Sequence, residues 1–458
     1  MSLVLFLLVT ALQLFMGFGL LGLFRLWLRP ILFLPLAILC GIGISSFVPF
    51  LLQLFYIPLT AFNIFAALIL VTLLLNLRWK YGLAHLSTVL PHKRPSLSFY
   101  DLPYILLAVF IVVVSVWRCY YYPPFPRDLT SGAEVIASYA VKEKTMINSV
   151  FSVDLESTNN PFKPPFIASL QIIYKYIGFT FGQVWLSMVF ACFIVFLYGA
   201  LCIKLHRLIA GLLVIFFLAI PEMYAYTFMA LFDYSNAVYF FLGVYFFVSY
   251  CSRRQKNELA FSGLMMALAT YTRSETLVLA CLMMLPLLWH HYRKKDSLLT
   301  MAGRTIIFLA PSFLCYFLTV TIYLGWYLPV SYQVGGLVNK NLLNLGPLFS
   351  RFYDMNMELI FSESGVNYYG YFIFIFIIVL LFDLVLSDFR TRSSRNWLAA
   401  ILVVYLGLAF LGYLLPLLDL DHSTKRGLFK MFPLMLLYMG TSRLLTQLST
   451  SIKKWEQS

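Results

Sequence analysis

Long apolar runs, each close to the length that a lipid bilayer requires, divide this chain. One example is YILLAVFIVVVSVW, residues 104–117. A helix needs about 20 mainly apolar residues to cross a hydrocarbon core about 30 Å thick. Such runs, bounded by charges, prolines or glycines, predict about 13 membrane-spanning helices. The predicted spans are 3–24, 31–53, 57–77, 101–118, 181–203, 207–221, 234–250, 259–272, 275–289, 305–325, 369–387, 397–416 and 429–446.

The composition supports the same class of protein. Of 458 residues, 61% are hydrophobic and only 11% are charged, whereas soluble proteins carry about 25% charged residues. We therefore predict an all-α polytopic membrane protein. The seven cysteines show neither metal-site nor disulfide spacing and are interpreted as small core residues. The absence of an Asn-x-Ser/Thr sequon favours a bacterial envelope over the secretory pathway.

Basic residues occupy every second connection between the predicted spans. Short loops rich in Lys and Arg stay in the cytoplasm, which places the N-terminus outside and the C-terminus in the cytoplasm. Most acidic residues lie in the other connections, including the long outer loops 119–180 and 326–368. The net charge of +14 is thus explained by topology, without nucleic acid. The basic connections contain Arg25, Arg29, Arg78, Lys80, Lys93, Arg94, Lys204, Arg207, Arg253, Arg254, Lys256, Arg293, Lys294, Lys295, Arg304, Arg390, Arg392, Arg395, Arg443, Lys453 and Lys454.

The first long outer loop carries the strongest candidates for chemistry. Asp128 follows a proline-rich turn just beyond a span and can act as a general base, although a solvated loop aspartate is the alternative. The stretch 132–151 has apolar residues at helical spacing and predicts an amphipathic helix at the membrane surface that begins near Glu134. Two prolines after Lys163 are expected to open the next helix. They hold this lysine at a helix start, where it is either a phosphate ligand or a snorkelling side chain.

Further charged residues lie at predicted outer connections. Glu222 and Asp233 flank a short connection, and Arg273 and Glu275 share a tight turn. Charges this close to hydrocarbon are costly unless they are paired or face a wet cavity. We therefore include all four as candidate site residues, with a simple turn of snorkelling side chains as the alternative for the last two.

The segment LLDLDHSTKRGLFKMFPLML contains two more candidates. Asp419, Asp421 and His422 have a spacing that suits a divalent cation. Lys425, Arg426 and Lys430 follow, and they break the positive-inside pattern because this connection is predicted to lie outside. An anionic ligand such as a lipid phosphate would account for them.

Together these features resemble the GT-C integral-membrane glycosyltransferases, the relatives of protein O-mannosyltransferases and of the lipid A aminoarabinose transferase. In that family an acidic residue opens the first large outer loop and a KPPL-like or HPPL-like motif closes it. Asp128 and the Lys163 segment NPFKPPF are similar to these two elements. Asp233 resembles an acidic residue that often starts a later span, and KRGLFKMFPLML is similar to the family's R-Y-x-x-P ending. The spacing of Asp128 and Glu134 is wider than the family's acidic pair.

This resemblance implies a transferase that uses a polyprenyl-phosphate sugar and inverts the anomeric carbon. It implies Asp128 and Glu134 as catalytic residues, and Lys163, Arg273, Lys425 and Arg426 as ligands of the donor phosphate. The acceptor would be a glycan, lipid or protein on the periplasmic face of a bacterial inner membrane. No cofactor is required, and a divalent cation is left open. The implied organisation is an N-terminal transmembrane part, 1–100, a GT-C-like core, 101–446, and a cytoplasmic tail, 447–458.

Two other functions remain open on the sequence. A transporter or flippase would favour internal repeats and ionisable residues at the membrane midplane, and neither pattern is found in the sequence. A glycan polymerase or ligase would also use lipid-linked donors and long outer loops. The size of the transferred glycan would distinguish it from a transferase of single sugars.

Overall fold

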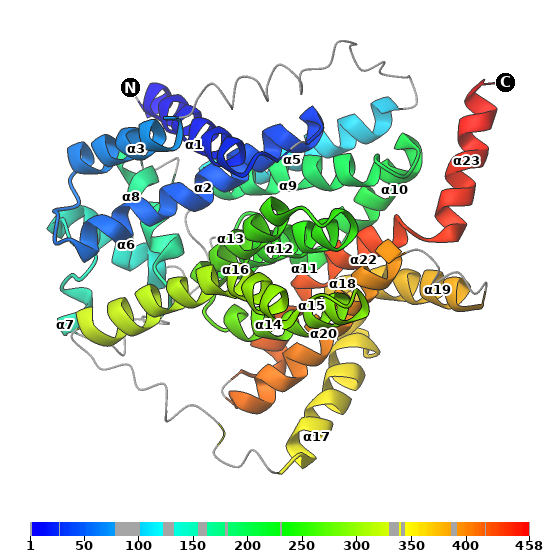
Figure 1. Cartoon of the computed structure of the whole chain (residues 1–458). Coiled ribbons are helices and arrows are strands. Elements are labelled where there is room, and N and C mark those ends of the chain that lie inside the picture. The colour runs from blue at the N-terminus through cyan, green and yellow to red at the C-terminus, as the bar shows by residue number, and fades with distance from the viewer. Residues whose placement is uncertain are drawn as a thin grey trace. The chain divides into compact units, whose positions relative to one another are not determined.

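The computed structural model describes most of the chain as helix in two compact units. The described residues are 2–26, 28–77, 101–121, 132–153, 163–178, 182–229, 231–328, 339, 344–385, 392–416 and 418–457. Unit 1 comprises Met1–Gly199, Tyr226–Ser235 and Phe317–Tyr332, and unit 2 comprises Ala200–Ala225, Asn236–Tyr316 and Gln333–Ser458. All regular secondary structure among these described residues is helical (Figure 1), so the predicted all-α class is confirmed.

Seven helices in the described part are long and apolar enough to cross a membrane. An eighth is obtained if α18 (Glu363–Tyr369) and α19 (Phe372–Val385), which are bent by 94°, count as one span. A polytopic membrane protein is therefore supported, and the count of about 13 spans stays a prediction. The seven are α1 (Ser2–Phe24), α2 (Pro30–Leu54), α5 (Leu102–Tyr121), α9 (Val184–Leu201), α12 (Phe232–Arg253), the continuous pair α16 and η4 (Leu298–Tyr327), and Ser394–Leu414 within α20 (Arg392–Leu414).

The other predicted spans are shorter helices. Three of them are α3 (Ala61–Leu75), α10 (Arg207–Leu218) and α13 (Lys256–Thr272). The prediction of one helix at 275–289 is wrong, because α14 (Thr276–Leu282) ends and α15 (Met284–Arg293) begins around Met283. Pro286 explains the break, since it has no N–H to donate to the carbonyl of residue 282 and its ring crowds that carbonyl.

The prediction of one helix at 429–446 is also wrong. Helix α22 (Phe432–Met439) ends before Gly440, and α23 (Arg443–Gln457) begins three residues later. The Ser442 hydroxyl accepts a hydrogen bond from the backbone N–H of Leu445 at 3.3 Å. A serine in that position starts a new helix because it satisfies a backbone donor that the helix leaves open. The predicted tail 447–458 therefore lies largely within α23.

Unit 1 is built on the close packing of α1 against α2. A Cβ at Gly17 would lie 1.7 Å from the carbonyl oxygen of Ala37, and one at Gly41 would lie 1.7 Å from that of Gln13. Small residues allow such close approach of membrane helices. The buried Gln13 side chain bonds Ser45 Oγ at 3.0 Å and accepts from the Tyr174 hydroxyl at 3.0 Å. This second bond attaches α8 (Phe166–Ile177) to the pair.

The described part of the first outer loop contributes α6 (Glu134–Glu143), α7 (Val150–Val153) and α8 to unit 1. Helix α8 begins directly after Pro165, as the two prolines predict, and nearly all of its residues are buried. The predicted amphipathic helix is confirmed over α6 but ends earlier than 151, because Lys144 adopts a left-handed conformation with φ of 63°. Helices α6 and α8 pack together (Figure 1).

In unit 2, a buried amide fixes the turn that carries Arg273. The Asn236 side-chain nitrogen, on α12, donates to the carbonyl of Ala269 at 2.7 Å and to the hydroxyls of Thr272 and Thr276 at 2.8 and 2.9 Å. These contacts join α12 to the end of α13 and the start of α14. The turn between the last two helices is thereby held in one place.

Candidate functional site

Lys425 lies at the centre of a cluster of residues from three predicted outer connections. Its ammonium nitrogen is 2.9 Å from Glu222 Oε1 and 3.8 Å from the centre of the Tyr368 ring. The Tyr369 hydroxyl donates to the Lys425 carbonyl at 3.0 Å. An aromatic face and a carboxylate both stabilise a lysine cation. The structure thus brings two sequence-predicted residues, Lys425 and Glu222, into direct contact.

Arg273 and Glu275 form an ion pair that is largely shielded from water. Their side chains are 8% and 15% exposed, so they are not snorkelling to solvent. The pair lines a small cavity together with Ser423, Thr424 and Lys430, and Lys430 is itself buried. The cavity measures about 20 Å³, which is room for about one water molecule and too little for a phosphate. An anion larger than water would require these side chains to move.

Arg351, from α17 (Gly346–Asp354) in the second long loop, anchors the same region. Its guanidinium donates to the Leu418 carbonyl and, at 2.6 Å, to the Thr424 hydroxyl. Partial burial lowers the pKa of Arg351 from its ordinary value, although an arginine still stays charged at neutral pH. Arg351 is not among the residues predicted from the sequence, where its only signal is an isolated arginine in a predicted outer loop.

Asp419 serves as a helix cap. Its carboxylate accepts backbone N–H bonds from His422 at 3.2 Å and Ser423 at 2.8 Å, and lies 2.7 Å from His422 Nδ1. Burial opposes ionisation of Asp419, but the hydrogen bonds from Ser423 and His422 outweigh it and lower the pKa. In the described ranges no three His, Cys, Asp or Glu side chains could share a metal ion. The metal site at Asp419, Asp421 and His422 stays a prediction.

Unit 1 holds Glu134 in a second polar cluster. The Glu134 carboxylate forms an ion pair with Lys175, whose side chain is only 5% exposed. It also accepts a hydrogen bond from Gln171 Nε2 at 2.7 Å. Trp185 Nε1 in turn donates to Gln171 Oε1 at 3.1 Å. Glu134 is therefore directed inward, against α8, rather than toward water. Lys175 could have been recognised in the sequence as a single charge within an apolar helix.

The remaining predicted residues lie as follows. Asp128 is outside the described residues, so its role stays a prediction. Asp233 is buried in the first turn of α12, where a carboxylate is favoured by the helix dipole. Lys163 is half-buried, two residues before the cap of α8. Lys163 belongs to unit 1 and the half-buried Arg426 to unit 2, and their predicted approach stays a prediction.

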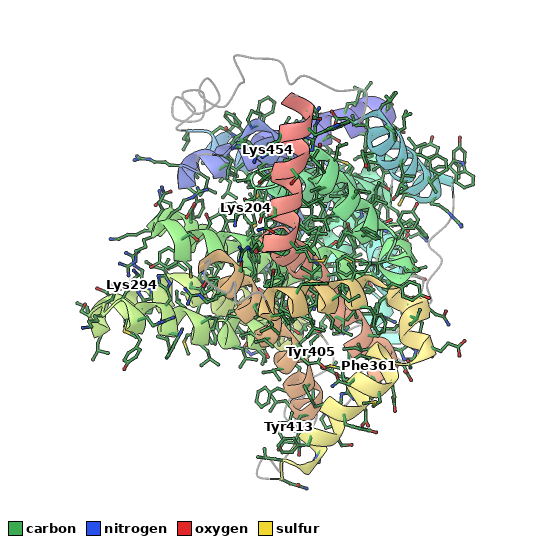
Figure 2. All side chains as sticks on the ribbon, turned by 90° about the vertical axis from the view of Figure 1, so that its right-hand side faces the viewer. Lys204, Lys294, Phe361, Tyr405, Tyr413 and Lys454 are labelled. Carbon is green, nitrogen blue, oxygen red and sulfur yellow. The ribbon has the colours of Figure 1, made fainter. Side chains whose placement is uncertain are left out.

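Within unit 2, connections predicted to share a side of the membrane are in contact with one another. The predicted outer set meets through Lys425–Glu222 and through the cavity beside Arg273. The predicted inner set meets through Arg254–Asp296 at 2.5 Å and Arg207–Glu456 at 2.9 Å. Figure 2 shows Lys204 and Lys454, of the inner set, well apart from Tyr413, whose hydroxyl donates to Asn344 of the outer loop at 3.1 Å. This grouping is what the alternating charges predict.

Comparisons with protein-family models, with curated proteins and with solved structures found no match.

Proposed function

We propose that this chain is a GT-C-like integral-membrane glycosyltransferase, which moves a sugar from a polyprenyl-phosphate donor to an acceptor on the periplasmic face of a bacterial inner membrane. In this proposal the chain crosses the membrane about 13 times, with α3, α10 and α13 among the spans. The acceptor is a glycan, a lipid or a protein.

One observation carries most of the proposal. Arg273 and Lys430 meet at one small cavity although they are far apart in sequence, and Lys425 is close to Lys430 along the chain and pairs with Glu222. Cations on the predicted outer side run against the positive-inside pattern. A phosphate-bearing lipid, whose tail stays in the bilayer, is a ligand that needs cations at this level of the membrane.

Glu222 and Glu275 would balance the positive charges of this cluster while no donor is bound. Glu222 neutralises Lys425, and Glu275 neutralises Arg273, so that neither cation stays uncompensated in a poorly hydrated place. An arriving donor phosphate would replace Glu222 as the partner of Lys425. The bond between the anomeric carbon and the phosphate oxygen would then break, and the charge that develops on the phosphate would be stabilised by Lys425 and Arg426.

Asp128 is proposed to act as the general base. It would remove the proton from the acceptor hydroxyl or amine while the acceptor atom attacks the anomeric carbon opposite the leaving phosphate, which inverts that carbon. Glu134 was predicted to be catalytic, but its contacts with Lys175 and Gln171 favour a positioning role. It would fix the start of α6, six residues after Asp128.

Sugar transfer in proteoliposomes tests the proposal. Purified protein would be supplied with a radiolabelled polyprenyl-phosphate sugar, and the release of polyprenyl phosphate would be measured for wild type and for Asp128→Asn. The variant should lose about two to four decades in rate and keep its binding of the donor. Lys454→Ala, on the exposed face of α23, is the matched control. Near-normal release by Asp128→Asn would remove this residue from the mechanism, and movement of intact donor across the bilayer without cleavage would establish the flippase alternative.

A further inference from the structure

A cavity of about 230 Å³ lies in unit 2, among connections predicted to face the cytoplasm. Four segments line it: the turn after α9, the last turns of α12, the start of α20 and the end of α22. It is more than ten times the size of the cavity beside Arg273 and has room for a phosphate group with part of an attached chain. It is a different place from the cluster around Lys425, because it is lined by the opposite set of connections.

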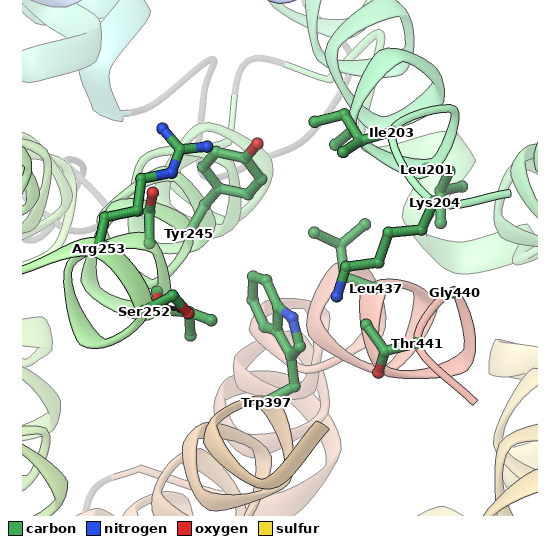
Figure 3. A pocket seen from close by; sticks show the side chains of 13 residues that line it. Leu201, Ile203, Lys204, Tyr245, Ser252, Arg253, Trp397, Leu437, Gly440 and Thr441 are labelled. Atoms are coloured by element: carbon green, nitrogen blue, oxygen red, sulfur yellow. Dashed lines mark hydrogen bonds between the residues drawn. The ribbon is translucent and has the colours of Figure 1, made fainter. Parts of the chain in front are cut away.

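Two cationic side chains make this cavity electropositive. Figure 3 shows Lys204 and Arg253 on opposite sides of it, with the indole of Trp397 between them. No Asp or Glu is among the described residues that line it. Arg253 is also 3.1 Å from the buried Glu258, which lies outside the lining and accepts from Ser249 at 2.8 Å. This pair fixes the arginine, and its guanidinium has further N–H groups for a ligand.

Lys204 is exposed at this cavity, so an anion can reach its ammonium group. Desolvation lowers the pKa of Lys204 from its ordinary value, because burial disfavours the charged ammonium. An anion beside Lys204 would reverse this effect and favour the charged form. The hydroxyls of Ser252 and Thr441 also line the cavity, but each donates its proton to a backbone carbonyl, that of Val248 at 3.1 Å and that of Tyr438 at 2.7 Å. The two cations are therefore the main ligands for an anion here.

The rest of the lining is apolar, and this decides between kinds of anion. Ile203, Leu437 and Trp397 line the cavity beside the two cations. A free phosphate would gain nothing from these groups, whereas a lipid presents a charged phosphate next to apolar chains. Indole rings are also enriched where polar headgroups meet hydrocarbon. The inner leaflet carries the anionic lipids that attract Lys and Arg at the cytoplasmic surface.

We propose that this cavity binds the phosphate group of an anionic phospholipid of the inner leaflet, with Lys204 and Arg253 as its two cationic ligands and Trp397 beside the glycerol and upper acyl chains. The site does not depend on glycosyl transfer. It would hold under any function in which the basic connections face the cytoplasm.

The test measures the phosphatidylglycerol that stays bound to detergent-purified protein, by native mass spectrometry. Replacing Lys204 by Gln removes one charged contact and should weaken retention about 10- to 100-fold, and Lys204→Arg should restore most of it. Lys454→Gln, which removes an equal charge outside the cavity, should change retention little. Equal retention by Lys204→Gln and Lys454→Gln would overturn the proposal.

Two further measurements distinguish a bound lipid from a soluble phosphate, and a second variant covers the case in which the first does not fold. Phosphatidylcholine, which has no net charge, should bind much less than phosphatidylglycerol, and inorganic phosphate should not displace the lipid. Displacement by inorganic phosphate would show a site for a soluble anion and would overturn the lipid assignment. If Lys204→Gln does not fold, Arg253→Gln supplies the same comparison, because it removes the other cationic contact of the cavity. Unchanged retention by that variant would count against the site.

Discussion

At one end of unit 2, the described lining of the cavity beside Arg273 contains the carboxylate of Glu275. At the other end, the described linings of the cavities beside Lys204 and beside Lys294 contain no carboxylate. The first end is predicted to face the periplasm, and the second end is predicted to face the cytoplasm. Cations in the cytoplasmic connections need no specific partner to orient a membrane protein. Cations on the outer side run against that pattern, and here Lys425 and Arg273 have acidic neighbours. Inner cations are paired as well, as Arg254–Asp296 and Arg207–Glu456 show. The two ends therefore differ in their cavities, because only the cavity beside Arg273 has a carboxylate in its described lining.

The comparison requires the two ends to lie on opposite sides of the membrane. Asp421→Cys and Lys294→Cys place single thiols at exposed positions of the two ends, in a background without the seven native cysteines. A membrane-impermeant thiol reagent added to intact cells should label position 421 and not position 294, which is an all-or-none difference. Labelling of both positions, or of 294 alone, would invalidate the comparison.

The buried ion pair of unit 1 shows how much a paired charge matters when water is excluded. Lys175→Met would leave Glu134 beside α8 without its cation and should lower the free energy of unfolding by about 3–5 kcal/mol. The double variant Glu134→Gln/Lys175→Met should recover most of this loss because no charge then stays uncompensated. Denaturant titration in detergent would measure both. A single variant as stable as wild type would show that water reaches Glu134.

Charge removal should affect donor binding only at the outer end. Lys425→Ala should weaken binding of a polyprenyl-phosphate sugar about 10- to 100-fold, since a charge-assisted contact contributes about 1.5–3 kcal/mol. Lys294→Ala, an equal loss of charge at the inner end, should bind the donor as wild type does. Equilibrium binding of labelled donor in detergent checks both, and a similar loss in the two variants would point to general electrostatic attraction instead of a site.

The smallest effect is expected from the cap at Asp419. Its pKa is lower in the folded chain than when unfolded, so its contribution to stability is present above the unfolded value of about 4 and is lost as the pH falls through the lower folded value. The side chain is half exposed, and screening should keep the effect below about 1 kcal/mol. Unfolding midpoints between neutral and acidic pH should therefore fall slightly less in Asp419→Asn than in wild type. If the unfolding midpoints of the variant and of wild type depend on pH in the same way, the Asp419 cap does not contribute to stability.

One feature that depends on local sequence, the start of α8, was predicted correctly. The start of α8 after Pro164 and Pro165 follows from the covalent structure of proline, and it lies where it was expected. Two breaks were missed although their signals were present. Pro286 interrupts the stretch 275–289, and Gly440 with Ser442 divides 429–446, yet the continuous hydrophobicity of both stretches was given more weight than these residues.

The sequence by itself determined that this chain is an all-helical membrane protein with basic and acidic connections in alternation, because hydropathy and charge act over short segments of chain. Only the tertiary structure decided which charges meet. Glu134 and Lys175 are separated by 41 residues, and the Arg351 and Thr424 side chains by 73. Their pairing depends on how helices pack, and no periodicity along the chain encodes it. The cavity between Lys204 and Arg253 likewise exists only because four separate segments come together around it.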